Sequence, residues 1–81
     1  METRVAVMSI IVEDVAQVET LNNILHEYRE NIIGRMGLPY HPKKINIISI
    51  ALDAPQDVIS ALSGRIGNLE GVSVKTAFSK E

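Results

Sequence analysis

The stretch NIIGRMGLPYHPKKINIISIAL, residues 31–52, decides most of the fold of this protein. Its second half, residues 45–52, is the most apolar run of the chain and is rich in β-branched side chains, which is typical of a strand covered on both faces. Its first half, residues 32–38, is broken by Gly34 and Gly37, and glycine inside a strand marks a bulge or a close backbone approach. A polar turn with two prolines separates the halves. The sequence therefore predicts a β-hairpin with an irregular first arm.

Two further stretches complete the predicted sheet. Residues 4–12 are largely apolar on both faces, as in a central strand. Residues 72–78 alternate in polarity, as in a half-exposed strand. The element order is strand, helix, strand, strand, helix, strand. With right-handed crossovers, this order predicts an α+β, ferredoxin-like βαββαβ sandwich, in which a four-stranded antiparallel sheet of spatial order 4-1-3-2 carries both helices on one face.

Amphipathic periodicity predicts the helices. The first spans residues 15–30, with Asp14 as its N-cap and Gln17 at the last position of a capping box. The second spans residues 55–66, and Gly67 is expected to end it as a left-handed C-cap. The predicted core combines both helices with the two central strands and consists of Val7, Val18, Leu21, Leu25, Ile48, Ile50, Leu62 and Ile66.

Length and composition limit the function. The 81 residues predict one domain, residues 1–81, and so small a chain needs an efficient core or a partner subunit. The chain has no cysteine, which excludes disulfides, thiolate metal sites and thiol catalysis. A net charge of −2 gives no general attraction to nucleic acid or to an anionic membrane, so we expect neither partner. No apolar run approaches the roughly 20 residues that span a bilayer, and no signal peptide is apparent, so we expect a cytoplasmic protein.

The central strands offer more apolar surface than two helices can cover. Odd-numbered and even-numbered side chains of residues 4–12 point to opposite faces, and both sets are largely apolar. A monomer would therefore expose an apolar patch of several hundred Å². We expect a homo-oligomer, either a dimer or a dimer of dimers. The sequence leaves face-to-face and edge-to-edge pairing open.

The segment IIGRMGLPY at residues 32–40, the following INIIS at 45–49 and the ending GVSVKTAFSK at 71–80 resemble one family over nearly the whole chain. That family comprises regulators of the iron-only hydrogenase system in anaerobic bacteria. The resemblance implies an ACT-like fold, similar to the ligand-sensing domain of the nickel-responsive repressor. It also implies a regulatory role beside hydrogenase maturation, with a hydrogenase-system protein as a partner.

Two features depart from the patterns of related sensors. ACT domains that bind amino acids usually carry a glycine in the loop after the first strand, and residues 12–16 contain none. The nickel site of the repressor uses several histidines and a cysteine, whereas this chain has only His26 and His41. The resemblance therefore transfers neither site, and we predict no metal and no cofactor.

The first arm of the hairpin holds the residues best suited to a ligand. Arg35 lies between Gly34 and Gly37, so its guanidinium could bind a carboxylate or phosphate while the glycines let the ligand approach the backbone. Tyr40 and His41, in the turn that follows, could close over the ligand. The alternatives are an edge-strand arginine that prevents aggregation and an ordinary solvated turn. We predict these five residues as a site for a small anionic ligand.

Two classes of function remain. The first is a small regulatory, ligand-sensing ACT-like module that acts through oligomer interfaces. The second is a structural or interaction protein that binds a hydrogenase maturation partner and no small molecule. The acidic residues Glu13, Asp14 and Glu19 are explained by helix capping and the helix dipole. No set of catalytic side chains can be argued, so we expect that the protein is not an enzyme.

Overall fold

The predicted hairpin is present in the structure, a computed structural model that describes residues 2–80. Its arms, β2 (Ile32–Tyr40) and β3 (Ile45–Ala54), pair antiparallel and are joined by the 3₁₀ turn η3 (His41–Lys43). On its other side, β3 pairs with β1 (Arg4–Val12), and β4 (Val72–Phe78) pairs with the free side of β1. The resulting strand order, β2-β3-β1-β4, confirms the predicted topology.

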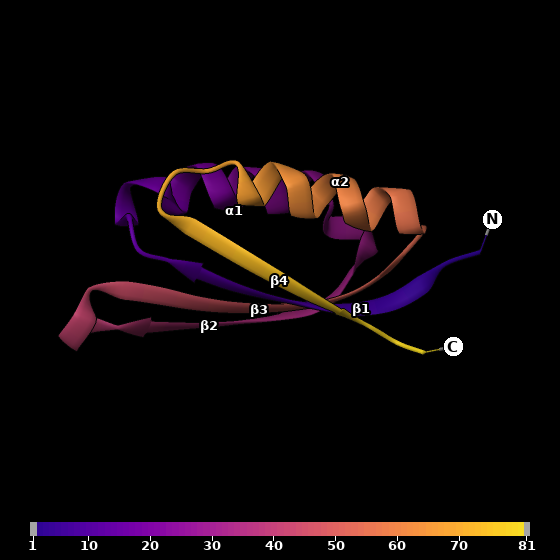
Figure 1. The fold of residues 1–81 in the computed structure, drawn as a ribbon, viewed down its shortest axis with the longest axis horizontal. Helices are drawn as coiled ribbons and strands as arrows, with labels where there is room; N and C mark the ends of the chain where they lie inside the picture. Colours follow the sequence, from indigo (N-terminus) through magenta and orange to yellow (C-terminus); the bar gives the residue numbers. More distant parts are fainter. Residues whose placement is uncertain (1, 81) are drawn as a thin grey trace.

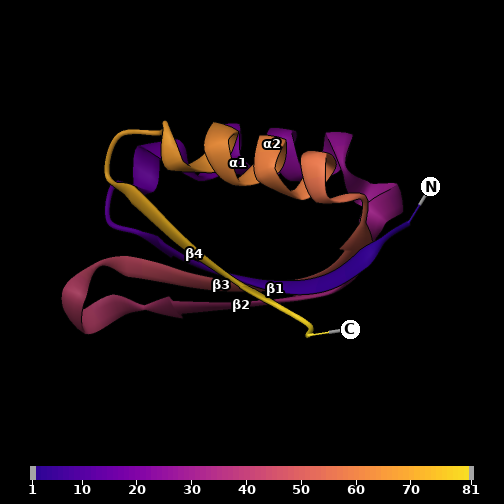
Figure 2. The same cartoon turned by 45° about the vertical axis from the view of Figure 1, so that its right-hand side comes forward.

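Both helices cover the same face of this sheet (Figure 1), and a view turned by 45° shows the same two layers (Figure 2). The second helix, α2 (Gln56–Gly67), lies within a residue of its predicted bounds. The first helix is shorter than predicted, because α1 spans only Val18–Glu27 and residues 15–17 and 29–31 form 3₁₀ turns. No helix in residues 2–80 is long and apolar enough to cross a membrane.

The capping residue explains the shortened first helix. The carboxylate of Asp14 accepts a hydrogen bond of 3.0 Å from the backbone N–H of Ala16, as an N-cap does. The turn that this bond begins is a 3₁₀ turn, and Gln17 then occupies the N-cap position of α1 without a side-chain capping bond. The predicted capping box is therefore incomplete: Asp14 caps, and Gln17 does not.

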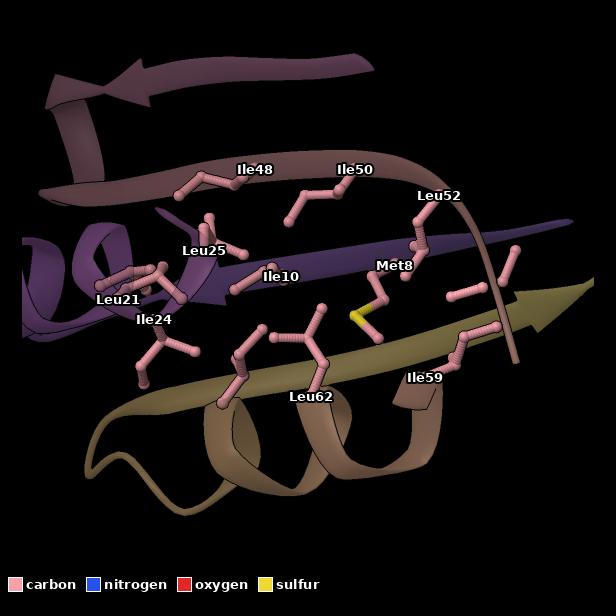
Figure 3. Packing of buried hydrophobic residues seen from close by; sticks show 14 residues of the cluster. Met8, Ile10, Leu21, Ile24, Leu25, Ile48, Ile50, Leu52, Ile59 and Leu62 are labelled. Carbon is pink, nitrogen blue, oxygen red and sulfur yellow. The ribbon is translucent and has the colours of Figure 1, made fainter. Parts of the chain in front are cut away.

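The core lies between the sheet and the helices (Figure 3). The even-numbered side chains of β1 from Ala6 to Val12, among them Met8 and Ile10, are buried against the helices. The prediction that Val7 belongs to the core is wrong, because Val7 is 40% exposed and points away from the helices. Both faces of β1 are apolar, so the sequence pattern could not decide which face the helices cover. Of the remaining predicted core residues, Val18 is partly buried. The others are buried: Leu21, Leu25, Ile48, Ile50, Leu62 and Ile66.

The other side of the sheet, which no helix of residues 2–80 covers, is called the open face below. The strand register places there the odd-numbered residues of β1, β3 and β4 and the even-numbered residues of β2 from Gly34 onward. Large apolar side chains on the open face are 39–68% exposed: Val5, Val7, Ile11, Met36, Leu38, Tyr40 and Ile47. This is the uncovered apolar face that the sequence predicts.

The sequence predicts a left-handed conformation at Gly67, and this prediction is wrong. Among residues 2–80, the glycine with that conformation is Gly71. Gly67 is the last residue of α2, whose C-cap is Asn68 in a right-handed conformation, and Gly71 has a φ of +74°. The carbonyl of Gly71 accepts a 2.7 Å hydrogen bond from the N–H of Glu13. A Cβ at Gly71 would lie 2.7 Å from the Cβ of Asp14, so the turn before β4 and the loop after β1 are in direct backbone contact.

Candidate functional site

A groove runs between α1 and the edge strand β2 on the helix side of the sheet, and it is called the α1–β2 groove below. It exists because neither helix covers β2, so that every residue of β2 after Ile32 is exposed. Two pockets of about 240 and 230 Å³ lie along it. Pockets for drug-sized ligands start at roughly 300 Å³, so each pocket suits a molecule of few atoms.

Arg35 stands between the two pockets and lines both of them, as does Asn22 of α1. Arg35 is paired in the sheet with the buried Ile50, so its side chain points to the helix side. Its Nη2 donates a 2.8 Å hydrogen bond to Oδ1 of Asn22. Both side chains are exposed, and a ligand carboxylate could replace the amide oxygen as a stronger, charge-assisted acceptor.

The first pocket is polar at its rim. Asn22, His26 and Arg29 line it from the α1 side, and Leu25 and Ile32 supply its apolar part. Arg29 is held in place by a 2.9 Å hydrogen bond from its Nη1 to the carbonyl of His26. Among residues 2–80, no Asp or Glu lines either pocket. The groove is therefore locally positive although the protein carries a net charge of −2.

The second pocket is mainly apolar. Val18, Leu38 and Ile48 line it, together with Pro39 and the amide side chain of Asn46. Gly37 also lines it and pairs in the sheet with Ile48, which is buried on the helix side. A Cβ at Gly37 would therefore point into the groove, and it would meet no atom within 4 Å. The glycine leaves open the space that a side chain would fill.

The other predicted site residues lie elsewhere in the structure. Gly34 pairs with Ala51 and Tyr40 pairs with Ile45, which places both residues on the open face. His41 lies in η3 at the tip of the hairpin. Of the five predicted residues, the structure thus brings together Arg35 and Gly37 in the groove, and it separates the other three from them.

Three groove residues were not singled out as ligand partners by the sequence. Asn22, His26 and Arg29 follow one another at spacings of four and three, so they share one side of α1 and the turn after it. This spacing was the sequence signal that could have identified the three residues as one group. It does not indicate a ligand site by itself, because the polar side of a helix normally faces water. His26 and His41 lie on separate elements, and residues 2–80 contain no group of three or more His, Cys, Asp or Glu side chains that could hold a metal.

An ion pair ties α1 to α2. Arg65 donates hydrogen bonds from Nη1 and Nη2 to Oε1 and Oε2 of Glu27, at 2.8 and 3.0 Å. These bonds lower the pKa of the Glu27 carboxyl and raise the pKa of the Arg65 guanidinium. The guanidinium also lies 5.7 Å from the centre of the Tyr28 ring. Since the pair is exposed, its contribution to stability is small.

Comparison with known proteins identifies relatives. Residues 4–76 match the model of the TM1266-like family, described as "Iron-only hydrogenase system regulator, putative". The solved structure of the uncharacterized protein TM1266 from Thermotoga maritima is similar to this chain at 35% identity, with a TM-score of 0.93 over 98% of this chain and 100% of that one. No curated protein matches the chain.

A second solved structure shares the fold alone. A formyltetrahydrofolate deformylase from Pseudomonas putida KT2440 is 13% identical, with a TM-score of 0.63. The match covers 90% of this chain but only 28% of the deformylase chain. The fold therefore also occurs as one part of a larger enzyme chain.

Proposed function

Because this chain belongs to the TM1266-like family of iron-only hydrogenase system regulators, we propose that it is a small regulatory module that binds a small anion in the α1–β2 groove. The observation that carries the proposal is the placement of Arg35, which reaches across the groove to Asn22 between two small pockets. We propose no catalytic role, no metal and no cofactor. The proposal keeps the cytoplasmic location expected from the sequence.

The two pockets favour a carboxylate with a short, branched apolar tail. Arg35 and Arg29 offer guanidinium donors, which match the geometry of a carboxylate. On the other side of Arg35, Val18 and Ile48 offer apolar surface, and Gly37 leaves room beside them. A ligand that places its carboxylate at Arg35 and its tail over Gly37 would use both pockets. Inorganic phosphate would use only the polar one.

A panel of acetate, 3-methylbutanoate and phosphate tests this function. A ligand that binds only the folded protein raises the melting temperature by mass action. We expect 3-methylbutanoate to raise the melting temperature, followed by circular dichroism, more than acetate or phosphate does at the same concentration. The same shift should be absent in Arg35→Ala. A panel in which no anion raises the melting temperature would overturn the proposed ligand binding.

The open face favours a second candidate function, that of an interaction module which binds a hydrogenase-system protein and no small molecule. Its large exposed side chains, such as Met36 and Leu38, are suited to a protein surface. Failure of the whole anion panel, with the fold intact, would favour this candidate. Under both candidates we propose a homo-oligomer, either a dimer or a dimer of dimers, and no direct contact with nucleic acid.

A further inference from the structure

We infer that two copies of this chain associate by packing their open faces together, sheet against sheet, and not by joining sheet edges. The inference rests on the self-association proposed above and specifies the surface that it uses. Four properties of the described residues support it: the apolar area of the open face, its relief, its charges, and the features of the two sheet edges.

The open face has the area and composition of an interface core. Its large apolar side chains come from β1, β2 and β3 and are each at least 39% exposed. Together they present several hundred Å² of apolar surface, which monomeric soluble proteins rarely leave exposed in one patch. A stable interface of ordinary size buries about 800 Å² on each partner, with its apolar part at the centre. The open face can supply that centre.

The relief of the open face is self-complementary. The register aligns Leu38, Ile47 and Ile11 in one row across three strands, which forms a ridge of large side chains. In the neighbouring row, Ser49 and Ser9 lie directly opposite each other on the two central strands, between Met36 on β2 and Lys75 on β4. The small serine side chains form a trough beside the ridge. Two sheets packed face to face interdigitate their inner side chains, so the ridge of one copy can fill the trough of the other.

The charges of the open face favour a second copy over an unrelated partner. In the described part of the chain, the four strands place two charged side chains on it, the acidic Asp53 on β3 and the basic Lys75 on β4. Because the two charges are of opposite sign, a two-fold axis can place Asp53 of each copy near Lys75 of the other. The face therefore needs no partner of opposite net charge.

Both edges of the sheet carry features that oppose pairing with another strand. On β2, Pro39 offers no backbone N–H, and a register shift between Ile32 and Gly34 bends the edge. On β4, Lys75 lies in the middle of the seven-residue strand. Native proteins use proline, bulges and lysine in this way to prevent edge-to-edge association. Self-association is thereby directed to the face of the sheet.

Sedimentation velocity at micromolar concentration tests this inference with a single charged substitution. Ile47→Lys places a cation in the ridge of the open face, and Ala61→Lys places the same cation on an exposed position of α2 as the control. We expect the wild type and Ala61→Lys to sediment as an oligomer. Ile47→Lys should sediment as a folded 8.9 kDa monomer, with an unchanged circular dichroism spectrum. If Ile47→Lys does not fold, Ser9→Lys replaces an exposed hydroxyl in the trough and serves the same purpose.

The outcomes separate the two levels of the proposal. A wild-type protein that remains an 8.9 kDa monomer would overturn self-association itself. An oligomeric wild type whose folded open-face variants stay oligomeric would overturn the face-to-face assignment and leave self-association standing. Loss of the oligomer in Ala61→Lys as well would show that added charge acts without regard to position, which also contradicts the assignment.

Discussion

The guanidinium of Arg35 on β2 donates a 2.8 Å hydrogen bond to the side-chain oxygen of Asn22 on α1, and this bond spans the α1–β2 groove between its two pockets. The two residues lie 13 positions apart, and the helix end and the turn that leads into β2 bring them together. The bond joins two exposed side chains, so breaking it costs the fold little and makes the arginine available to a ligand. The proposed function depends on replacing the side-chain oxygen of Asn22 by a ligand carboxylate as the acceptor of this hydrogen bond.

Filling the space above Gly37 is expected to block the ligand without harming the fold. A Cβ at this position meets no atom within 4 Å, and its direction is into the apolar pocket. Gly37→Leu should therefore keep its melting temperature and lose the shift that 3-methylbutanoate causes in the wild type. Circular dichroism melts with and without the carboxylate measure both effects.

Gly34 provides the matched control for this substitution. Like Gly37, it lies on β2 and has no atom within 4 Å of its Cβ position, but it lies on the open face of the sheet. Gly34→Leu should retain the full shift with 3-methylbutanoate. Equal loss of the shift in both variants would mean that a general change in β2, and not occupation of the pocket, is responsible.

Gly71 is expected to be the most sensitive glycine of the chain. Its φ of +74° disfavours any side chain, and a Cβ would lie only 2.7 Å from the Cβ of Asp14. Gly71→Ala should lower the free energy of unfolding by roughly 2 kcal/mol or more. Gly67→Ala is the control, because a Cβ at this helical position makes an ordinary contact of 3.5 Å with Val74. Chemical denaturation of both variants checks this order, and equal losses would contradict it.

The core assignment predicts a contrast between two buried leucines and one exposed valine. Leu25 of α1 and Leu62 of α2 are buried, so truncation of either to Ala should cost about 2–5 kcal/mol. Val15 continues the apolar stripe of the first helix in the sequence, but it is 59% exposed. Val15→Ala should therefore cost less than about 1 kcal/mol. Urea denaturation measures all three variants, and small losses at both leucines would show that the helix faces are misassigned.

The ion pair between Arg65 and Glu27 predicts an acid-sensitive contribution to stability. The hydrogen bonds from Arg65 lower the pKa of Glu27 in the folded protein below its value in the unfolded chain. The pair therefore stabilises the fold fully above the unfolded-state pKa, and this contribution is lost as the pH falls through the folded-state pKa. Glu27→Gln should melt slightly below the wild type near neutral pH, and the two should melt together in strong acid. A difference that persists in acid would indicate lost packing instead.

Much of the fold was predictable because independent signals agree. The order of elements and the two strands that are apolar on both faces lead to the same arrangement, with β1 and β3 at the centre. The assignment of Val7 to the core failed for the same reason that β1 was identified as central. When both faces of a strand are apolar, the pattern gives the position of the strand in the sheet and not the direction of its side chains.

The candidate site was predictable only in its β2 half. Arg35 and Gly37 are distinctive within an apolar strand, and the structure places both in the groove. Asn22, His26 and Arg29 belong to a polar helix side that would ordinarily face solvent. They become groove residues because α1 lies beside an edge strand that it does not cover, and this offset between layers has no local sequence signal.

Isothermal titration calorimetry with 3-methylbutanoate, on the wild type, Arg35→Ala and Lys80→Ala, tests the central claim most directly. Hydrogen bonds to a charged group are each worth about 1.5–3 kcal/mol, so Arg35→Ala should bind the carboxylate roughly tenfold to hundredfold more weakly than the wild type. Lys80→Ala removes an exposed cation that lines neither groove pocket and should bind as the wild type does. Equal affinity in the wild type and Arg35→Ala, or no binding to the wild type, would contradict the account.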